Sequence, residues 1–275
     1  MGSNASKESR PTSLEATTVT VSRTPQEIVD EILGYLSADS DSLQSCALVS
    51  KPWVPSCRRY LFYTIVFTPR NMVRWLEVFP VPENSPAHHA RHLRFPIGLR
   101  NDDGPEEFFE YTPWFTNVEG VIFFEHKRRP PSRMPSFWRL PQSATSLTIN
   151  ANTVTLPQVQ SIMVQLPNLA NLSLSWYHTA KGEEALPRIG LRGRFGGELQ
   201  LHGEHVDGGV MDMLLEVPTG LYFTKVEVHS TGECLLSTVR LVEACNKTLV
   251  KLSYTTDSNG KSHRSSRLWR SKYRH

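Results

Sequence analysis

Two segments of the sequence contain residue types that bind metals or phosphates in other proteins. His88, His89 and His92 lie in a proline-rich stretch, but no cysteine or carboxylate stands near them at a metal-ligand spacing. The glycine-rich run at 193–197 does not open a helix pattern, as a phosphate-binding loop must, and it better fits a loop that enters a strand. The nucleophile-elbow, P-loop, dinucleotide, HExxH and protein-kinase patterns do not occur. The sequence therefore predicts a protein that is not an enzyme and needs no metal or cofactor.

The first six residues, M-G-S-N-A-S, match the pattern for N-myristoylation of Gly2 after removal of the initiator methionine. One acyl chain holds a membrane only marginally, so stable anchoring needs a second signal, for which the basic residues from Lys261 to Arg274 are a candidate. The alternative is an unmodified disordered leader and a solvated tail. Membrane contact is therefore expected only if Gly2 is acylated.

Composition places the chain among ordinary folded proteins, because 39% of its 275 residues are hydrophobic and 21% are charged. No stretch approaches the roughly 20 consecutive apolar residues that span a bilayer, and the polar N-terminus lacks the apolar core of a secretory signal. Lys and Arg (30) barely exceed Asp and Glu (27), and the excess lies in the C-terminal tail. We expect a cytoplasmic and/or nuclear protein.

Structure is expected to begin at Thr24, where three helix-start signals coincide: a hydroxyl at the N-cap, Pro25 at the first helical position and Glu27 at N3. An apolar stripe follows and predicts an amphipathic helix to about Ser37, formed by Ile28, Val29, Ile32, Leu33 and Leu36. A polar turn with Asp39 and Asp41 as possible caps leads into a second short helix over Leu43–Val49, which Pro52 stops. A third helix is expected over about 53–61. Such a small module cannot bury all its apolar stripes, which predicts a partner.

Beyond this module the sequence repeats. Eight short apolar-x-apolar segments begin at Ile65, Leu93, Val121, Leu147, Leu172, Leu199, Val226 and Leu252, separated by 28, 28, 26, 25, 27, 27 and 26 residues. An apolar or small residue stands three positions before each, as in the leucine-rich pattern L-x-x-L-x-L. Helix-like stretches lie between several of them, at 71–78, 157–166, 210–217 and 234–245. The period predicts an irregular leucine-rich-repeat solenoid of about eight short parallel strands with helices, an α/β or α+β fold.

The middle residue of each strand segment is expected to point away from the solenoid core, toward a bound ligand. These residues form a mixed surface with no dominant charge: Val66, Arg94, Ile122, Thr148, Ser173, Gln200, Glu227 and Ser253. A nucleic acid is therefore not an expected partner. Arg94, Ile122, Thr148, Ser173, Gln200 and Glu227 are the candidates for binding a protein substrate.

Residues 24–67 resemble an F-box, through TPQEIV at 24–29, Ile32-Leu33, Leu36, Leu43, CALVSK at 46–51, Trp53 and RYLF at 59–62. The repeats that follow are similar to the degenerate leucine-rich region of many fungal F-box proteins. The resemblance implies a three-helix hook that binds the Skp adaptor. It implies adaptor contact, or burial in the hook's own core, for Pro25, Ile28, Ile32, Leu36, Leu43, Val49 and Trp53.

This resemblance divides the chain into a disordered leader (1–22), an F-box (23–67), a degenerate leucine-rich-repeat domain (68–256) and a disordered basic tail (257–275). It implies the receptor subunit of a Skp/cullin/F-box E3 ubiquitin ligase, which binds the adaptor, and through it cullin, and holds an unknown protein substrate for ubiquitin-dependent proteolysis. The alternative is a repeat scaffold outside any ligase, whose F-box has weakened because Thr24 stands where the family usually has leucine. An unrecognised hydrolase is a third reading.

Overall fold

The computed structural model describes residues 25–97, 106–125, 139–151, 154–175, 195–202, 208–218, 220–230, 235–258 and 261–268. Within these residues a nine-stranded sheet has its strands in sequence order, β1 to β9. Strands β1 to β8 run parallel and β9 runs antiparallel to β8. The strands are β1 Thr64–Val66, β2 His92–Ile97, β3 Gly120–Glu125, β4 Ser146–Asn150, β5 Asn171–Ser175, β6 Phe195–His202, β7 Leu221–Ser230, β8 Lys251–Ser258 and β9 Lys261–Leu268.

The sheet register follows the sequence repeat. Across β1 to β8, the first apolar residue of each repeat lies directly beside its equivalent on the next strand: Ile65, Leu93, Val121, Leu147, Leu172, Leu199, Val226 and Leu252. Parallel neighbours in strict chain order, joined by connections of similar length, define a solenoid-like α/β fold. This part of the predicted fold class is confirmed.

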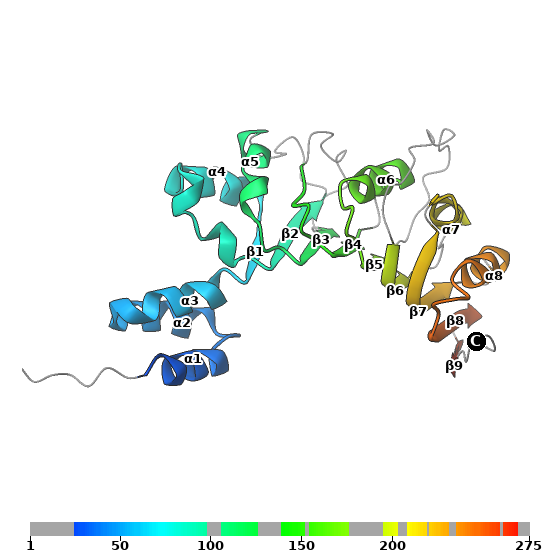
Figure 1. Cartoon of the computed structure of the whole chain (residues 1–275), viewed down its shortest axis with the longest axis horizontal. Coiled ribbons are helices and arrows are strands. Elements are labelled where there is room, and N and C mark those ends of the chain that lie inside the picture. The colour runs from blue at the N-terminus through cyan, green and yellow to red at the C-terminus, as the bar shows by residue number, and fades with distance from the viewer. Residues whose placement is uncertain are drawn as a thin grey trace, which may run out of the picture.

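Helices α4 to α8 lie along one side of the curved sheet, and between β3 and β8 no helix in the described residues covers the other side (Figure 1). They are α4 Pro69–Val78, α5 Glu106–Glu110, α6 Leu156–Val164, α7 Gly208–Leu215 and α8 Leu235–Ala244. Short 3-10 helices at Pro82–Asn84, Pro86–His89 and Thr112–Trp114 complete this layer. In the part of the chain that the structure describes, no helix is long and apolar enough to cross a membrane.

Local signals in the sequence fix where these helices start. The Thr68 hydroxyl accepts a hydrogen bond from the Asn71 backbone N–H, with Pro69 in the first turn of α4. At α6, Thr155 and Gln158 form a reciprocal capping box, in which the Gln158 side chain accepts from the Thr155 backbone N–H at 2.8 Å. The helix starts therefore follow from residues next to each strand end, as the repeat requires.

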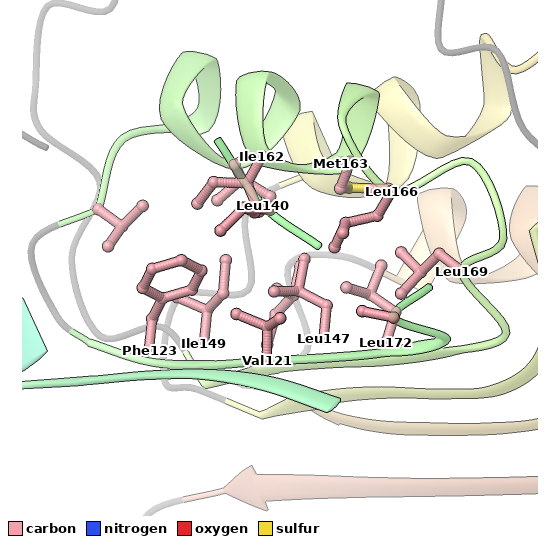
Figure 2. Close-up of a cluster of buried hydrophobic side chains, with 14 of the residues drawn as sticks. Val121, Phe123, Leu140, Leu147, Ile149, Ile162, Met163, Leu166, Leu169 and Leu172 are labelled. Atoms are coloured by element: carbon pink, nitrogen blue, oxygen red, sulfur yellow. The ribbon is translucent and has the colours of Figure 1, made fainter. Parts of the chain in front are cut away.

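The core lies between the sheet and the helix layer. Figure 2 shows side chains from the strands facing those of α6 and the turn after it, among them Val121, Phe123, Leu147, Ile149, Leu172, Ile162, Met163 and Leu166. Each of these is at most 5% exposed. Burying one such aliphatic side chain contributes about 1.5–3 kcal/mol, so this ladder supplies most of the stabilisation of the repeats.

Toward the N-terminal end the same core becomes aromatic. The Phe67 ring centroid lies 4.5 Å from Phe108, 5.4 Å from Trp75, 5.6 Å from Phe115 and 6.0 Å from Phe95. Rings at these distances in edge-to-face, tilted or stacked arrangements contribute beyond their buried area. The cluster therefore fastens β1 and β2 to the helix layer at the point where the N-terminal helices join the sheet.

Four helical segments precede the sheet: α1 Gln26–Tyr35, α2 Ser40–Val49, a 3-10 turn Lys51–Trp53 and α3 Val54–Leu61. Pro25 occupies the N-cap of α1 rather than its first turn, and Thr24 lies outside the described residues. Helix α2 begins three residues before the predicted Leu43 start, because the Asp39 carboxylate accepts from the N–H groups of Asp41 and Ser42. The three predicted helices are present, with corrected starts.

The N-terminal helices have a small core of their own, formed by Val29, Leu33, Leu43 and Cys57. They join the sheet without a linker, because only Phe62 and Tyr63 separate α3 from β1. The Tyr63 carbonyl accepts hydrogen bonds from the N–H groups of both Arg91 and His92, at 2.9 and 3.0 Å. Since Phe62 packs on the core of the repeats, the helices are fixed to the first strand.

The C-terminal tail differs from its prediction. Disorder was expected for 257–275, but Lys261–Leu268 form β9, which pairs with β8 from Ser258↔Lys261 to Lys251↔Leu268. The two residues between the strands are Asn259 and Gly260, a pair typical of tight hairpins. This local signal outweighs the polar composition. Residues 1–24, including Gly2 and the predicted leader, and residues 269–275 lie outside the described part.

The start of β6 also corrects a prediction. Phe195, Gly196 and Gly197, expected in a loop, are the first residues of the strand, and the β6–β7 register shifts between Gly197 and Glu198. Gly197 has a φ of +79°, and a Cβ at this position would collide with the Ala170 carbonyl oxygen. The bulge therefore requires glycine both for its backbone conformation and for its close approach to β5.

Removing a side chain from the buried ladder should destabilise the whole repeat region. Leu172 is 1% exposed, so we expect Leu172→Ala to lower the free energy of unfolding by about 3 kcal/mol. The control is Ser173→Ala on the opposite face of the same strand, which should change it by less than about 0.5 kcal/mol. Urea unfolding followed by circular dichroism measures both, and equal effects would contradict the assignment of the two faces.

Two glycines with positive φ allow the energetic cost of backbone strain to be compared with that of a steric collision. Gly220 has a φ of +80° but no atom within 4 Å of an added Cβ, whereas Gly197 combines the same backbone conformation with the collision. We expect Gly220→Ala to cost about 1–2 kcal/mol and Gly197→Ala clearly more, above about 3 kcal/mol. Thermal and urea unfolding compare the two, and a smaller loss for Gly197→Ala would contradict the bulge geometry.

Candidate functional site

Large apolar side chains are exposed on the N-terminal helices. On α1, Ile28 (47% exposed), Ile32 (42%) and Tyr35 (82%) follow one another at i, i+4 and i+7, and α2 exposes Leu48 (89%) and Val49 (73%). We call these five residues the helix surface. Side chains at this spacing lie on one face of a helix, so α1 presents a continuous apolar stripe. Exposed apolar groups at such a density are typical of a protein-binding surface.

The seven residues that the F-box resemblance singled out divide into two groups. Four are exposed and accessible to a partner: Pro25, Ile28, Ile32 and Val49. Leu43 is only 1% exposed and belongs to the core of the N-terminal helices, while Leu36 and Trp53 are partly buried against that core. These three residues therefore support the helical module from inside. Tyr35 and Leu48, which the sequence reading missed, are the most exposed apolar residues of the module.

A hydrogen-bond network holds the α1 stripe in place relative to α3. The Ser56 hydroxyl donates to Asp30 Oδ1 at 2.6 Å, and Gln26 Nε2 lies 2.9 Å from the same oxygen and 2.8 Å from Ser56 Oγ. The hydrogen bond from Ser56, followed by that from Gln26, holds the pKa of Asp30 below its usual value. Asp30 is therefore ionised near neutral pH and keeps one face of α1 turned toward α3, which leaves the apolar stripe outward.

The second exposed surface is the face of the sheet that points away from α4 to α8. The strand register aligns all the predicted outward residues in one row: Val66, Arg94, Ile122, Thr148, Ser173, Gln200, Glu227 and Ser253. We call this row and the rows two residues before and after it the sheet surface. Ser253 is only 3% exposed, so the row ends as an accessible surface at Glu227. The alignment predicted from the repeat is thus confirmed for all eight residues, of which the first seven are at least partly exposed.

The half of the sheet surface near β7 consists of paired polar and charged groups. Lys225 Nζ lies 2.9 Å from Glu198 Oε2, and this hydrogen bond raises the pKa of Lys225. Glu227 Oε1 lies 3.2 Å from His229 Nε2, and the hydrogen bond from His229 lowers the pKa of the Glu227 carboxyl. The charges of this half therefore largely satisfy one another.

Next to this pair, His202 stacks on His229 with 4.4 Å between ring centroids and an interplanar angle of 26°. Burial, and then the nearby His229, lower the pKa of His202 below its usual value. His202 is therefore neutral near pH 7 and contributes a flat ring rather than a charge to the surface. Among the residues that the structure describes, no three His, Cys, Asp or Glu side chains are grouped so as to hold a metal ion.

The half of the sheet surface near β2 is different, since it combines apolar side chains with one cation. Val66, Ile122 and Phe124 lie on the strands beside Arg94, and the Arg94 guanidinium carbon is 5.0 Å from the centroid of the Phe124 ring. Arg94 Nε is buried and has no hydrogen-bond partner among the described residues. The sequence reading found Arg94 but missed Phe124, which the same repeat phase would identify two residues after Ile122 in the third repeat.

The three histidines at 88–92 lie at the start of β2 and in the 3-10 helix before it. His88 and His89 lie in a 3-10 helix with ring centroids 3.9 Å apart, and His92 begins β2, where its ring packs edge-on against Tyr63. Burial lowers the pKa of His89. Packing against neighbouring rings accounts for His92 without a ligand.

Both surfaces are open faces of the molecule, a shape that suits contact with other macromolecules. One is an apolar helical stripe and the other is a long face of parallel strands with an apolar and a polar half. Comparison with known proteins adds no relative: no protein-family model, no curated protein and no solved structure matches this chain.

Proposed function

We propose that this chain is the substrate-recognition subunit of a Skp/cullin/F-box ubiquitin ligase. The helix surface binds the Skp adaptor, and through it cullin, while the sheet surface holds a target protein for ubiquitin-dependent proteolysis. The observation that carries the proposal is the exposed apolar stripe of Ile28, Ile32 and Tyr35, within the segment that resembles an F-box. Partners that bind by helix packing use aliphatic and aromatic anchors of this kind.

The join between the two surfaces supports the same proposal. A ligase receptor does no chemistry itself and acts by raising the effective concentration of its target near the conjugating enzyme. This effect is largest when the two binding surfaces keep a fixed geometry. The direct passage from α3 into β1, with the Tyr63 carbonyl bonded to the second strand, provides such a connection. For this function we expect the chain in the cytoplasm and/or the nucleus.

The alternative is an interaction scaffold that uses the sheet surface but has lost the ligase. It rests on Thr24, which replaces the leucine usual in the family and lies outside the described residues. Adaptor binding separates the two functions, because a scaffold of this kind would keep its target but not the adaptor.

Two carboxylates on the α1 stripe should abolish adaptor binding. Ile28→Asp/Ile32→Asp forces charges into the surface where the proposal buries two aliphatic side chains, so we expect the affinity for purified Skp adaptor to fall by at least about a hundredfold. The matched control is Val73→Asp, because Val73 is 45% exposed but lies on α4, outside the helical module. Isothermal titration calorimetry measures adaptor binding by the full chain as wild type, as the double variant and as the control.

The control should bind like the wild type. A wild-type chain that is folded by circular dichroism but does not bind the adaptor would overturn the ligase proposal and favour the scaffold. Adaptor binding that survives the double substitution unchanged would show that α1 is not the contact.

The exposed and buried residues of the helical module should respond in opposite ways to truncation. Tyr35→Ala and Leu48→Ala remove highly exposed side chains, so each should change the free energy of unfolding by less than about 0.5 kcal/mol but weaken adaptor binding about tenfold. Leu43→Ala removes a side chain that is 1% exposed and should lower the free energy of unfolding by about 3 kcal/mol. Denaturant unfolding and adaptor titration test both, and a stability loss in the first two variants would refute their assignment.

A further inference from the structure

Arg94 is a charged residue of the sheet surface for which the described residues provide no carboxylate partner. The described outward rows of β1 to β5 contain no Asp or Glu, and the nearest carboxylate on this face belongs to Glu198 on β6. Glu198 is already paired with Lys225. With neighbouring strands about 4.8 Å apart, it lies about 19 Å along the sheet from β2. Among the described residues of these outward rows, no carboxylate therefore lies beside Arg94.

The environment of Arg94 also leaves one of its donors unsatisfied. Its Nε is buried without a hydrogen-bond partner in the described residues, and the guanidinium lies over the Phe124 ring. A buried donor without a partner destabilises a fold, whereas a guanidinium stacked on a ring is already oriented for binding. A guanidinium oriented in this way, with no carboxylate partner among the described residues, points to an acceptor from outside the chain.

We propose that Arg94 binds the carboxylate of an aspartate or glutamate in the target protein, flanked there by aliphatic residues that pack on Val66 and Ile122. A carboxylate matches the two-pronged donor edge that the two terminal Nη groups of a guanidinium form. The inference rests on the proposed function in taking the sheet surface as the target-binding surface. It names the class of target segment: acidic at one position and aliphatic beside it.

A carboxylate fits this position better than a phosphate. A phosphate carries nearly two negative charges, so a protein site for it normally combines several cations or backbone N–H donors. Arg94 is the only Lys or Arg in the described outward rows of β1 to β5, and its flanking side chains are apolar. One cation between aliphatic walls is complementary to one negative charge on an otherwise apolar peptide.

The test uses three peptide libraries of the form X-X-Leu-Z-Leu-X-X, where X is random and Z is Glu, Gln or phosphoserine. The full chain is immobilised, and the amount of each library it retains is measured. We expect the Glu library to be retained about tenfold or more above the Gln library, because a hydrogen-bonded charge pair replaces a neutral contact. Equal retention of Glu and Gln, including retention of neither, would overturn the proposal. Preferential retention of the phosphoserine library would overturn the choice of carboxylate.

Variants of the chain test whether Arg94 is the residue that causes the preference for the Glu library. Arg94→Gln should abolish the preference for Glu, and Arg94→Lys should keep only part of it, because an ammonium group cannot form the two-pronged contact. Lys225→Gln is the matched control, since it removes a positive charge from the same surface about 24 Å along the sheet from Arg94, by the same strand spacing, and should leave the preference intact. A preference that survives Arg94→Gln, or that Lys225→Gln removes, would refute the role of Arg94.

The melting temperature distinguishes a binding residue from a structural one. Because Arg94 Nε has no hydrogen-bond partner among the described residues, Arg94→Gln should melt at the same temperature as the wild type or higher. A marked decrease would show that Arg94 supports the fold instead. The peptide assay contains no adaptor, so a chain that selects acidic peptides but does not bind the adaptor would reject the ligase while keeping this inference. A chain that binds the adaptor but shows no preference for acidic peptides would reject this inference while keeping the ligase proposal.

Discussion

The structure depends on one constraint. Every strand of the solenoid must place an inward apolar side chain directly beside the equivalent side chain of the neighbouring strand. Eight equivalent residues from Ile65 to Leu252 satisfy it, and they meet the helix layer in a continuous core. Because side chains alternate along a strand, fixing this row inward also fixes the next residue outward. The sheet surface, with Arg94 and Glu227 in its central row, is therefore a direct consequence of how the core is built.

The same constraint explains how much could be predicted from the sequence. The repeat period gave the strand order and the register, because equivalent apolar residues recur every 25–28 positions in the sequence. The alternation of side chains along each strand then gave the outward row. The starts of α1 and α2 were predicted less well. For α2, the sequence offers both Asp39 as a cap and Leu43 as the first apolar residue, and only the hydrogen bonds of the Asp39 cap decide between them. The strand at Lys261–Leu268 was missed because polar composition was weighed above the Asn259-Gly260 hairpin signal.

The features of the candidate surfaces that could not be predicted depend on three-dimensional neighbours. Whether Leu43 faces inward or outward is decided by the packing of α2 against α3, not by its spacing in the sequence. The position of the Arg94 guanidinium over Phe124 joins two strands whose residues are 30 positions apart in the chain. An unsatisfied buried donor is a property of that arrangement, so a reading of residue types alone finds the arginine but not the reason it stands out.

The hairpin of β8 and β9 has a consequence for the physical behaviour of the protein in solution. An open parallel sheet has a free backbone edge at each end, where a strand from another molecule can add and start aggregation. At one end β1 is only Thr64–Val66, too short to template much pairing, and at the other end β9 covers β8. The C-terminal hairpin thus covers the edge that β8 would otherwise leave free.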